Sequence, residues 1–241
     1  MTMRIKVAAI LGLALLAQAA VAEGQYEINQ LCVSTGCLAS DAPGWPVELT
    51  EPGSYRLTSN LTVSGINTVD AVLIASSNVS MNLNGYSNRG DVTCFGNDPI
   101  CFAGFAQFGV VTSSNEMNNI QISNGWVTGF DQDCIDLQGQ HSIVRDVQIA
   151  HCGENGLDVP NGFVERVMVH TVGANGGRFG RTTSVQNSRF INSRLAGVVG
   201  GVCQSNVFDS NRDTLDSTEE FCERLVENNT CGGSASPVNP C

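Results

Sequence analysis

Lysine is nearly absent from this chain of 241 residues, whose one lysine is Lys6. The first 22 residues are typical of a removable secretion signal, because Arg4 and Lys6 precede an apolar run (residues 7–19) and a small-residue cleavage site ends at Ala22. Cleavage after Ala22 would leave ten arginines and no lysine against 23 acidic residues, a net charge of −13. We therefore expect a secreted or periplasmic protein.

These absences exclude several classes of protein. Without lysine the mature chain has no P-loop, no Schiff-base lysine and no Ser-x-x-Lys nucleophile. A strongly anionic chain binds nucleic acid or an anionic membrane surface poorly, so we expect no nucleic-acid partner. After residue 22 no apolar run approaches the roughly 20 residues of a membrane span. No Cys-x-x-Cys pair occurs either, which disfavours a zinc site.

Ten cysteines follow the signal segment, and an even number in that context indicates a disulfide framework formed in an oxidising compartment. Proximity in the sequence predicts three local pairs and one pair between adjacent turns of the chain, and it leaves two cysteines over for a fifth pair. The expected pairs are Cys32–Cys37, Cys94–Cys101, Cys231–Cys241, Cys134–Cys152 and, as the remainder, Cys203–Cys222.

A repeat runs through the middle of the chain. Residues 119–125, 146–152 and 166–172 are similar short segments in which apolar side chains alternate with polar ones, as in β-strands. A second recurring unit appears between them, first at residues 134–139 and then at 156–161. Self-similarity at about 20 to 27 residues predicts a coil that returns above itself, which a β-sandwich would not require. We expect an all-β fold, a right-handed parallel β-helix of about seven coils.

The ends of such a coil need covering, because a bare end exposes unpaired strand edges. We expect a signal peptide at 1–22, an N-terminal cap segment at 23–52, the β-helix at 53–214 and a C-terminal cap at 215–241. Residues 26–32 are expected to form a short capping helix. Residues 217–220 have the form of a helix capping box and precede apolar residues at helical spacing up to Val226.

Alternation assigns side chains to the two sides of the coil wall. We expect Ile120, Val147 and Val167 to point inward. Continued to the next turn, the same rule places four polar residues in one inward column, where they would hydrogen-bond along the stack. These are Asn124, His151, Thr171 and Asn192. The column favours a structural rather than a catalytic role for His151.

One edge of the predicted coil gathers charge. If Ile135 and Leu137 point inward, Asp136 points outward, and Asp158 and Arg178 take the matching positions in the next two coils. The neighbouring turns add Asp131, Asp133, Glu154 and Arg181. Three interpretations fit: a Ca²⁺ site built from oxygen ligands, a carboxylate–arginine pair acting on a sugar, or a solvated acidic rim with a stacked salt bridge.

The segments 133–137, 147–152 and 156–159 resemble the core of the pectate-lyase-like β-helix superfamily, in which an acidic turn precedes a V-x-I-D-H-C strand and a DGL-x-D turn. Residues 41–46 and 52–62 are similar to secreted bacterial β-helix repeat proteins of uncharacterised activity. Ala150 and Asn155 stand where the family motif carries aspartate, and the polygalacturonase signature is missing.

The resemblance implies a polysaccharide-binding face. It also implies that carboxylates hold Ca²⁺ against a uronate while an arginine abstracts a proton. By position the Ca²⁺ ligands would be Asp131, Asp133, Glu154 and Asp158, and the base would be Arg178 or Arg181.

Two classes of function therefore remain open. The first is a secreted protein that binds an extracellular polysaccharide. If it is an enzyme, it cleaves that polysaccharide as a Ca²⁺-assisted lyase or, second, as a hydrolase using Asp136 and Asp158. The second is a non-catalytic envelope or surface scaffold. An insertion at residues 88–108, which breaks the repeat and holds Cys94 and Cys101, is expected to be either a lid over one face or a surface ornament.

Overall fold

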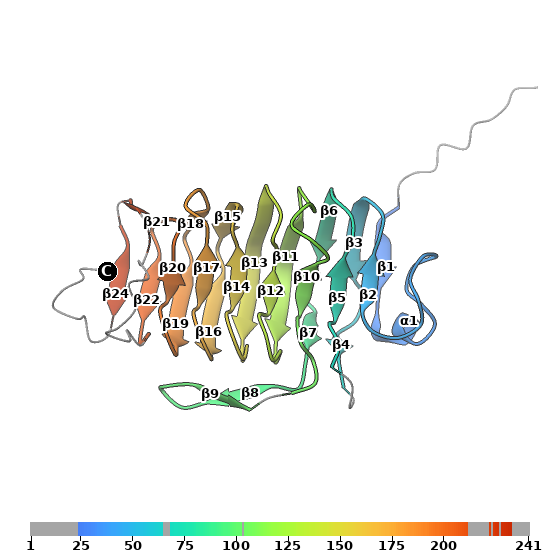
Figure 1. Cartoon of the computed structure of the whole chain (residues 1–241), viewed down its shortest axis with the longest axis horizontal. Helices are drawn as coiled ribbons and strands as arrows, with labels where there is room; N and C mark the ends of the chain where they lie inside the picture. The colour runs from blue at the N-terminus through green and yellow to red at the C-terminus, as the bar shows by residue number, and fades with distance from the viewer. Residues whose placement is uncertain are drawn as a thin grey trace, which may run out of the picture.

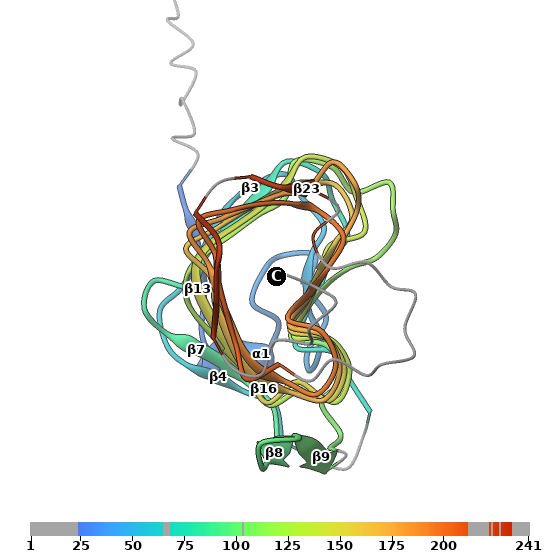
Figure 2. The ribbon, with the colours of Figure 1, turned by 90° about the vertical axis from the view of Figure 1, so that its left-hand side faces the viewer.

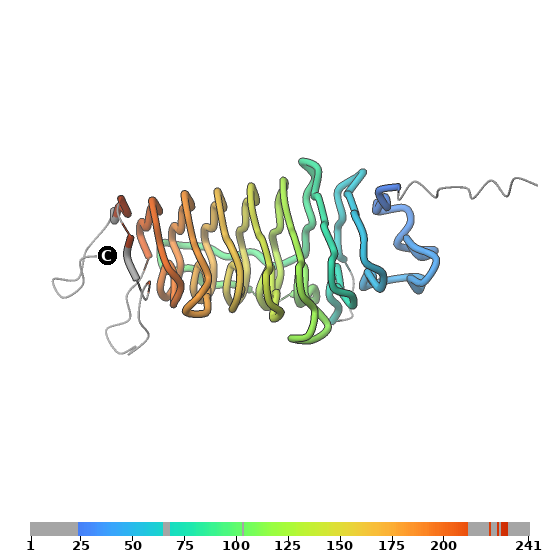
Figure 3. Tube along the Cα trace, turned by 90° about the horizontal axis from the view of Figure 1, so that it is seen from above, coloured from blue at the N-terminus to red at the C-terminus, as the bar shows by residue number. Residues whose placement is uncertain are grey.

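The computed structural model describes residues 24–64, 68–102, 104–211, 222, 224–226 and 228–232. They form an elongated parallel β-solenoid of about seven turns, which confirms the predicted all-β coil (Figures 1 and 3). The predicted signal segment 1–22 and the capping box at 217–220 lie outside these residues. The handedness of the coil stays a prediction, supported by the strong right-handed preference of parallel crossovers.

Each coil contributes strands to three faces of the solenoid. The front face, turned toward the viewer in Figure 1, is one seven-stranded parallel sheet. Its strands, in spatial order, are β2 (Val47–Leu49), β5 (Val72–Ile74), β10 (Val110–Thr112), β12 (Ile135–Asp136), β14 (Leu157–Val159), β17 (Gly177–Phe179) and β20 (Val198–Val199).

A larger parallel sheet forms the other two faces. The upper face holds β1 (Tyr26–Ile28), β3 (Gly53–Leu57), β6 (Val79–Asn82), β15 (Gly162–Glu165), β18 (Ser184–Gln186), β21 (Val202–Gln204) and β23 (Arg224–Leu225). The lower face holds β4 (Leu61–Thr62), β7 (Ser87–Arg89), β16 (Met168–Val172), β19 (Arg189–Ser193), β22 (Val207–Asp209) and β24 (Thr230–Gly232). Two long strands, β11 (Gln121–Thr128) and β13 (Ser142–Ala150), bend through the corner and serve both faces.

The core is a continuous apolar column inside the coil. Ile120, Val147 and Val167 are buried, as the alternation predicted. On the front face Ile135 and Leu157 are neighbours in register, and both are fully buried. Because every coil adds a layer of such side chains, each worth about 1.5–3 kcal/mol when fully buried, the stack is stabilised along its whole length.

The register between two of the repeats differs from the sequence alignment. Residues 119–125 do not stack on 146–152. Instead Ile122 lies beside Val144, and Val127 lies beside Ile149. Each coil contains two similar alternating segments, one on each side of a corner, so the pattern matches at more than one offset. The number of residues in each coil selects the true register, and the local pattern does not specify that number.

The predicted polar column does not point inward, although His151, Thr171 and Asn192 do stack in adjacent coils and Asn192 Nδ2 donates to Thr171 Oγ1 at 3.5 Å. Asn124, His151, Thr171 and Asn192 have positive φ angles of 66°, 55°, 57° and 54° and lie at corners of the coil, where they are half-buried or exposed. A left-handed residue rotates the chain between two strands, so strand alternation does not continue through it. Asn124 also belongs to a different corner, because it stacks beside Asp146 rather than His151.

The two ends also differ from expectation. Tyr26–Ile28 is strand β1, paired with β3, and the helix α1 (Gln30–Val33) is one turn that begins only after its N-cap Asn29. At the other end Arg224–Leu225 is strand β23, paired with β21, where a helix was predicted to reach Val226. In both places an open sheet edge offers backbone hydrogen bonds that a short helix would forgo. Strand pairing therefore starts before residue 53.

Four of the predicted disulfides are present, namely Cys32–Cys37, Cys94–Cys101, Cys134–Cys152 and Cys203–Cys222. Cys241, the predicted partner of Cys231, lies outside the described residues. No helix in the described part of the chain has the length and hydropathy needed to cross a bilayer.

The insertion forms a β-hairpin of β8 (Thr93–Phe95) and β9 (Ile100–Phe102), closed by Cys94–Cys101. It runs along the solenoid outside the corner that joins the lower and front faces (Figures 1 and 2). The Cys94 amide donates to His151 Nδ1 at 3.2 Å, and Asn192 Nδ2 donates to the Gly96 carbonyl at 3.0 Å. These contacts attach the hairpin to the corner residues.

Candidate functional site

The charged row predicted from the sequence exists on the front face. Asp136 of β12 is the register partner of Asp158 in β14, and Asp158 is the partner of Arg178 in β17. Asp136 and Asp158 stand between buried apolar residues, and Arg178 precedes the buried Phe179. Their side chains therefore lie on the outer side of the sheet, at about 4.8 Å from coil to coil.

A glutamine joins this row. Gln138 Nε2 donates to Asp136 Oδ1 and to Asp158 Oδ2, the latter at 3.1 Å. Its backbone amide is held by Thr112 Oγ1 at 3.0 Å. The sequence analysis missed Gln138, although its position two residues after Asp136 places it on the same side of an extended chain and was a usable signal.

Asp158 and Arg178 form an ion pair that is buried at one end. Arg178 Nε donates to Asp158 Oδ2 at 2.9 Å, and Nη2 donates to the same oxygen. The Asp158 side chain is 5% exposed and the Arg178 side chain is 58% exposed, so the carboxylate is covered while part of the guanidinium faces solvent. The hydrogen bond to Asp158 raises the pKa of Arg178. This favours an electrostatic or binding role for Arg178 over the role of a base.

A ladder of side-chain hydrogen bonds crosses three coils in the turns that precede β12, β14 and β17. Asp133 Oδ1 accepts from the Asn155 backbone amide at 2.7 Å and from Asn155 Nδ2 at 3.0 Å. Asn155 Oδ1 in turn accepts from the Asn175 amide at 3.2 Å and from Asn175 Nδ2 at 3.0 Å. Asn155 departs from the family motif, and here it is one step of this ladder. All three residues are buried.

Two carboxyl groups of this cluster hold their protons more tightly than usual. Burial raises the pKa of Asp133 to about 7 against the opposing effect of the Asn155 hydrogen bonds, and the charges of Asp136 and Asp158 add to the rise. Burial also raises the pKa of Asp136, while the hydrogen bond from Gln138 lowers it. Perturbed carboxyl groups beside a carboxylate–guanidinium pair are a recognised indication of a functional site, although structural networks produce them too.

The remaining predicted site residues are Asp131, Glu154 and Arg181. Asp131 is half-buried and accepts a 3.4 Å hydrogen bond from the Gly104 amide at the base of the insertion. Glu154 and Arg181 are exposed in turns that flank β14 and β17. Among the described residues no three His, Cys, Asp or Glu side chains are arranged to hold a metal ion. The Ca²⁺ site stays a prediction.

The two central histidines lie at another corner. The rings of His151 and His170 meet edge to face with centroids 6.2 Å apart. Burial lowers the pKa of both imidazoles, and the charge of Arg89 further lowers that of His151. Because His151 Nδ1 accepts the Cys94 amide, this imidazole serves to hold the hairpin.

Comparison of the chain with known protein families, curated proteins and solved structures finds no match. The parallel β-solenoid is consistent with the β-helix architecture implied by the resemblance, and it establishes the fold without an activity.

Proposed function

We propose that this protein is an extracytoplasmic polysaccharide-binding β-solenoid whose binding surface is the front-face row of Asp136, Gln138, Asp158 and Arg178. The single observation that carries the proposal is this row itself. It combines the carboxylate oxygens of Asp136 and Asp158, an amide that links them and an exposed guanidinium on the outer side of one parallel sheet. Sugar hydroxyls both donate and accept hydrogen bonds, so such a row suits them.

Two further features support this proposal. The groups are held by a rigid stack and by each other, so little side-chain entropy is lost when a ligand binds. The four disulfides fit a protein that works outside the cytoplasm, in keeping with the proposed secretion signal.

Cleavage of the bound polysaccharide is a second candidate function, and the raised pKa values of Asp133 and Asp136 favour it. With its pKa raised to about 7, Asp133 keeps its proton near neutral pH, as a general acid must, and the pKa of Asp136 is shifted in the same direction. One amide nitrogen reaches both Asp136 and Asp158. Asp136 and Asp158 are also register partners on adjacent strands, so the two carboxyl groups could act on one glycosidic bond.

Binding is tested by electrophoresis of the oxidised protein through gels that contain neutral or uronic-acid polysaccharides, with Ca²⁺ and with chelator. We expect retardation by at least one polysaccharide, and we expect Asp136→Asn and Arg178→Ala to weaken it about tenfold, the loss of one charged hydrogen bond. The matched control is Arg189→Ala, which removes an exposed guanidinium from the lower face. The absence of retardation in every gel, or equal effects of the two arginine variants, would overturn the proposal and favour the scaffold function.

Cleavage is tested separately on any polysaccharide that binds. Ultraviolet absorbance reports the unsaturated products of a lyase, and a reducing-end assay reports hydrolysis. Hydrolysis through the front-face carboxylates requires that Asp136→Asn lose the activity while the wild-type and variant proteins unfold at the same urea concentration. Binding without any product would leave a carbohydrate-binding protein that is not an enzyme.

A further inference from the structure

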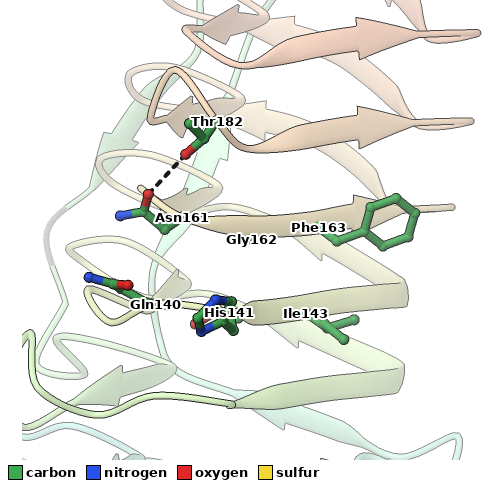
Figure 4. Close-up of a pocket in the computed structure, with 8 residues that line it drawn as sticks. Gln140, His141, Ile143, Asn161, Gly162, Phe163 and Thr182 are labelled. Carbon is green, nitrogen blue, oxygen red and sulfur yellow. Dashed lines mark hydrogen bonds between the residues drawn. The ribbon is translucent and has the colours of Figure 1, made fainter.

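A pocket of about 420 Å³ opens where the front-face strands turn into the upper face, a size typical of small-ligand sites (Figure 4). It is formed by three successive coils. Gln140 and His141 come from the turn after β12, Asn161 from the turn after β14, and Thr182 from the turn after β17. Ile143 and Phe163, which are register partners on the upper face, form its apolar wall.

The lining of this pocket contains no Asp, Glu, Lys or Arg, although the chain as a whole is strongly acidic. Its polar groups are two side-chain amides, two hydroxyls and one imidazole. The half-buried ring of Phe163 lies across from them (Figure 4). A pocket with an aromatic wall and neutral hydrogen-bonding groups on the opposite side suits a ligand that has one apolar face and hydroxyl groups at its rim. Burying a charged ligand here would leave its charge without a partner, which is costly.

The amide of Asn161 is already oriented for a ligand. Thr182 Oγ1 donates to Asn161 Oδ1 at 2.9 Å, so the carbonyl end of this side chain is engaged by the neighbouring coil (Figure 4). The Nδ2 group points away from that contact and also away from Phe163 (Figure 4), so it can donate to a hydroxyl at the rim of a ligand. At the inner side of the same wall, Ser142 Oγ is buried and has no hydrogen-bond partner among the described residues.

The pocket follows the charged row along the chain. Gln138, which bridges the two carboxylates, is separated from Gln140 by one residue, and Asn161 comes three residues after Asp158. An extended chain advances about 3.3 Å per residue and these segments bend, so the row and the pocket are separated by at most roughly 7 to 10 Å, a distance that one or two linked sugar units can span.

From this arrangement we propose that the pocket is a binding site for an uncharged pyranose unit, with the ring's C–H face packed on Phe163 and its hydroxyls bonded to Asn161, Gln140 and His141. The inference rests on the proposed function in one respect, namely that the front-face row binds a neighbouring unit of the same polysaccharide. It adds that this polysaccharide contains uncharged sugars at the position next to the row.

The test uses saturation-transfer NMR and titration calorimetry with neutral hexasaccharides of glucose, xylose and mannose. We expect saturation to pass from aromatic protons to the sugar C–H protons. We expect Phe163→Ala to lower the affinity about tenfold and Thr182→Val to lower it several-fold. The control is Phe102→Ala, which removes an aromatic ring that is 64% exposed on the hairpin and distant from the pocket in sequence.

The outcomes separate this inference from the proposed function. If Phe163→Ala and Phe102→Ala bind alike while Arg178→Ala loses binding, the pocket proposal is wrong and the front-face proposal stands. If Phe163→Ala loses binding while Arg178→Ala and Arg189→Ala bind alike, the pocket is a site and the front-face proposal is wrong. No binding of any neutral hexasaccharide at millimolar concentration overturns the pocket proposal. Because the Phe163 side chain points outward, far-ultraviolet circular dichroism should show that its variant folds.

Discussion

Replacing Asp133 by asparagine should stabilise the protein, and by an amount that depends on pH. Asp133 occupies the first step of a ladder whose next two steps are Asn155 and Asn175, and it accepts both of its hydrogen bonds through Oδ1. An asparagine at 133 retains that oxygen as an acceptor and removes a carboxyl group that is expensive to ionise in a buried position.

The magnitude follows from the pKa of Asp133, which rises from 3.8 to about 7 on folding. At 1.36 kcal/mol for each pKa unit, this corresponds to about 4 kcal/mol, which is an upper value. Since the folded pKa is the higher one, the folded state binds more protons between pH 3.8 and pH 7, and the wild-type protein loses stability as pH rises through that range. We expect Asp133→Asn to match the wild type near pH 4 and to be more stable by up to about 4 kcal/mol at pH 8.

The assay is equilibrium unfolding in urea with the disulfides intact, at several pH values between 4 and 8. Glu154→Gln is the control, because it removes a carboxylate from an exposed turn in the neighbouring coil. The reasoning is refuted if Asp133→Asn is no more stable than the wild type at pH 8, or if its gain is the same at both ends of the pH range. A stabilising variant that loses activity would show that Asp133 is retained for function at the expense of stability.

Three other expectations concern the same molecule. The pKa of His151 is below 6.5 in the folded state, and only the neutral imidazole accepts the Cys94 amide, so attachment of the hairpin should weaken as pH falls below about 7. We expect the hairpin amides to exchange hydrogen faster at pH 5 than at pH 8 after correction for intrinsic rates. Unchanged protection would contradict this. Arg178→Ala should lower the free energy of unfolding by about 2–3 kcal/mol, because it leaves the buried Asp158 carboxylate with the Gln138 amide but without its charged partner. Arg189→Ala should change it by less than about 0.5 kcal/mol, and equal losses in urea unfolding would be inconsistent with this. If Ca²⁺ binds near the front-face row, the melting temperature should rise across millimolar Ca²⁺ and fall back with chelator, and a constant melting temperature would argue against a bound ion.

The sequence was sufficient to predict the coil and its charged row. Asp136 stands between Ile135 and Leu137, and Asp158 stands between Leu157 and Val159; all four neighbours are buried apolar residues. Strand alternation has a period of two, so burial of the apolar pair fixes the outward position within each strand. The stacking of Asp136, Asp158 and Arg178 and the local disulfides therefore followed from residues close together in the chain.

The tertiary structure decided what depends on neighbours from other coils. The true register of residues 119–125, the bridging position of Gln138 and the ladder from Asp133 to Asn175 each require knowing which residue the next coil places alongside. The corners at Asn124 and His151 depend on single left-handed residues, which interrupt the alternation that sequence analysis extrapolates. At both ends an unpaired sheet edge turned segments with helical signals into strands, since backbone pairing with an existing sheet outweighs the weak preference of a short helix.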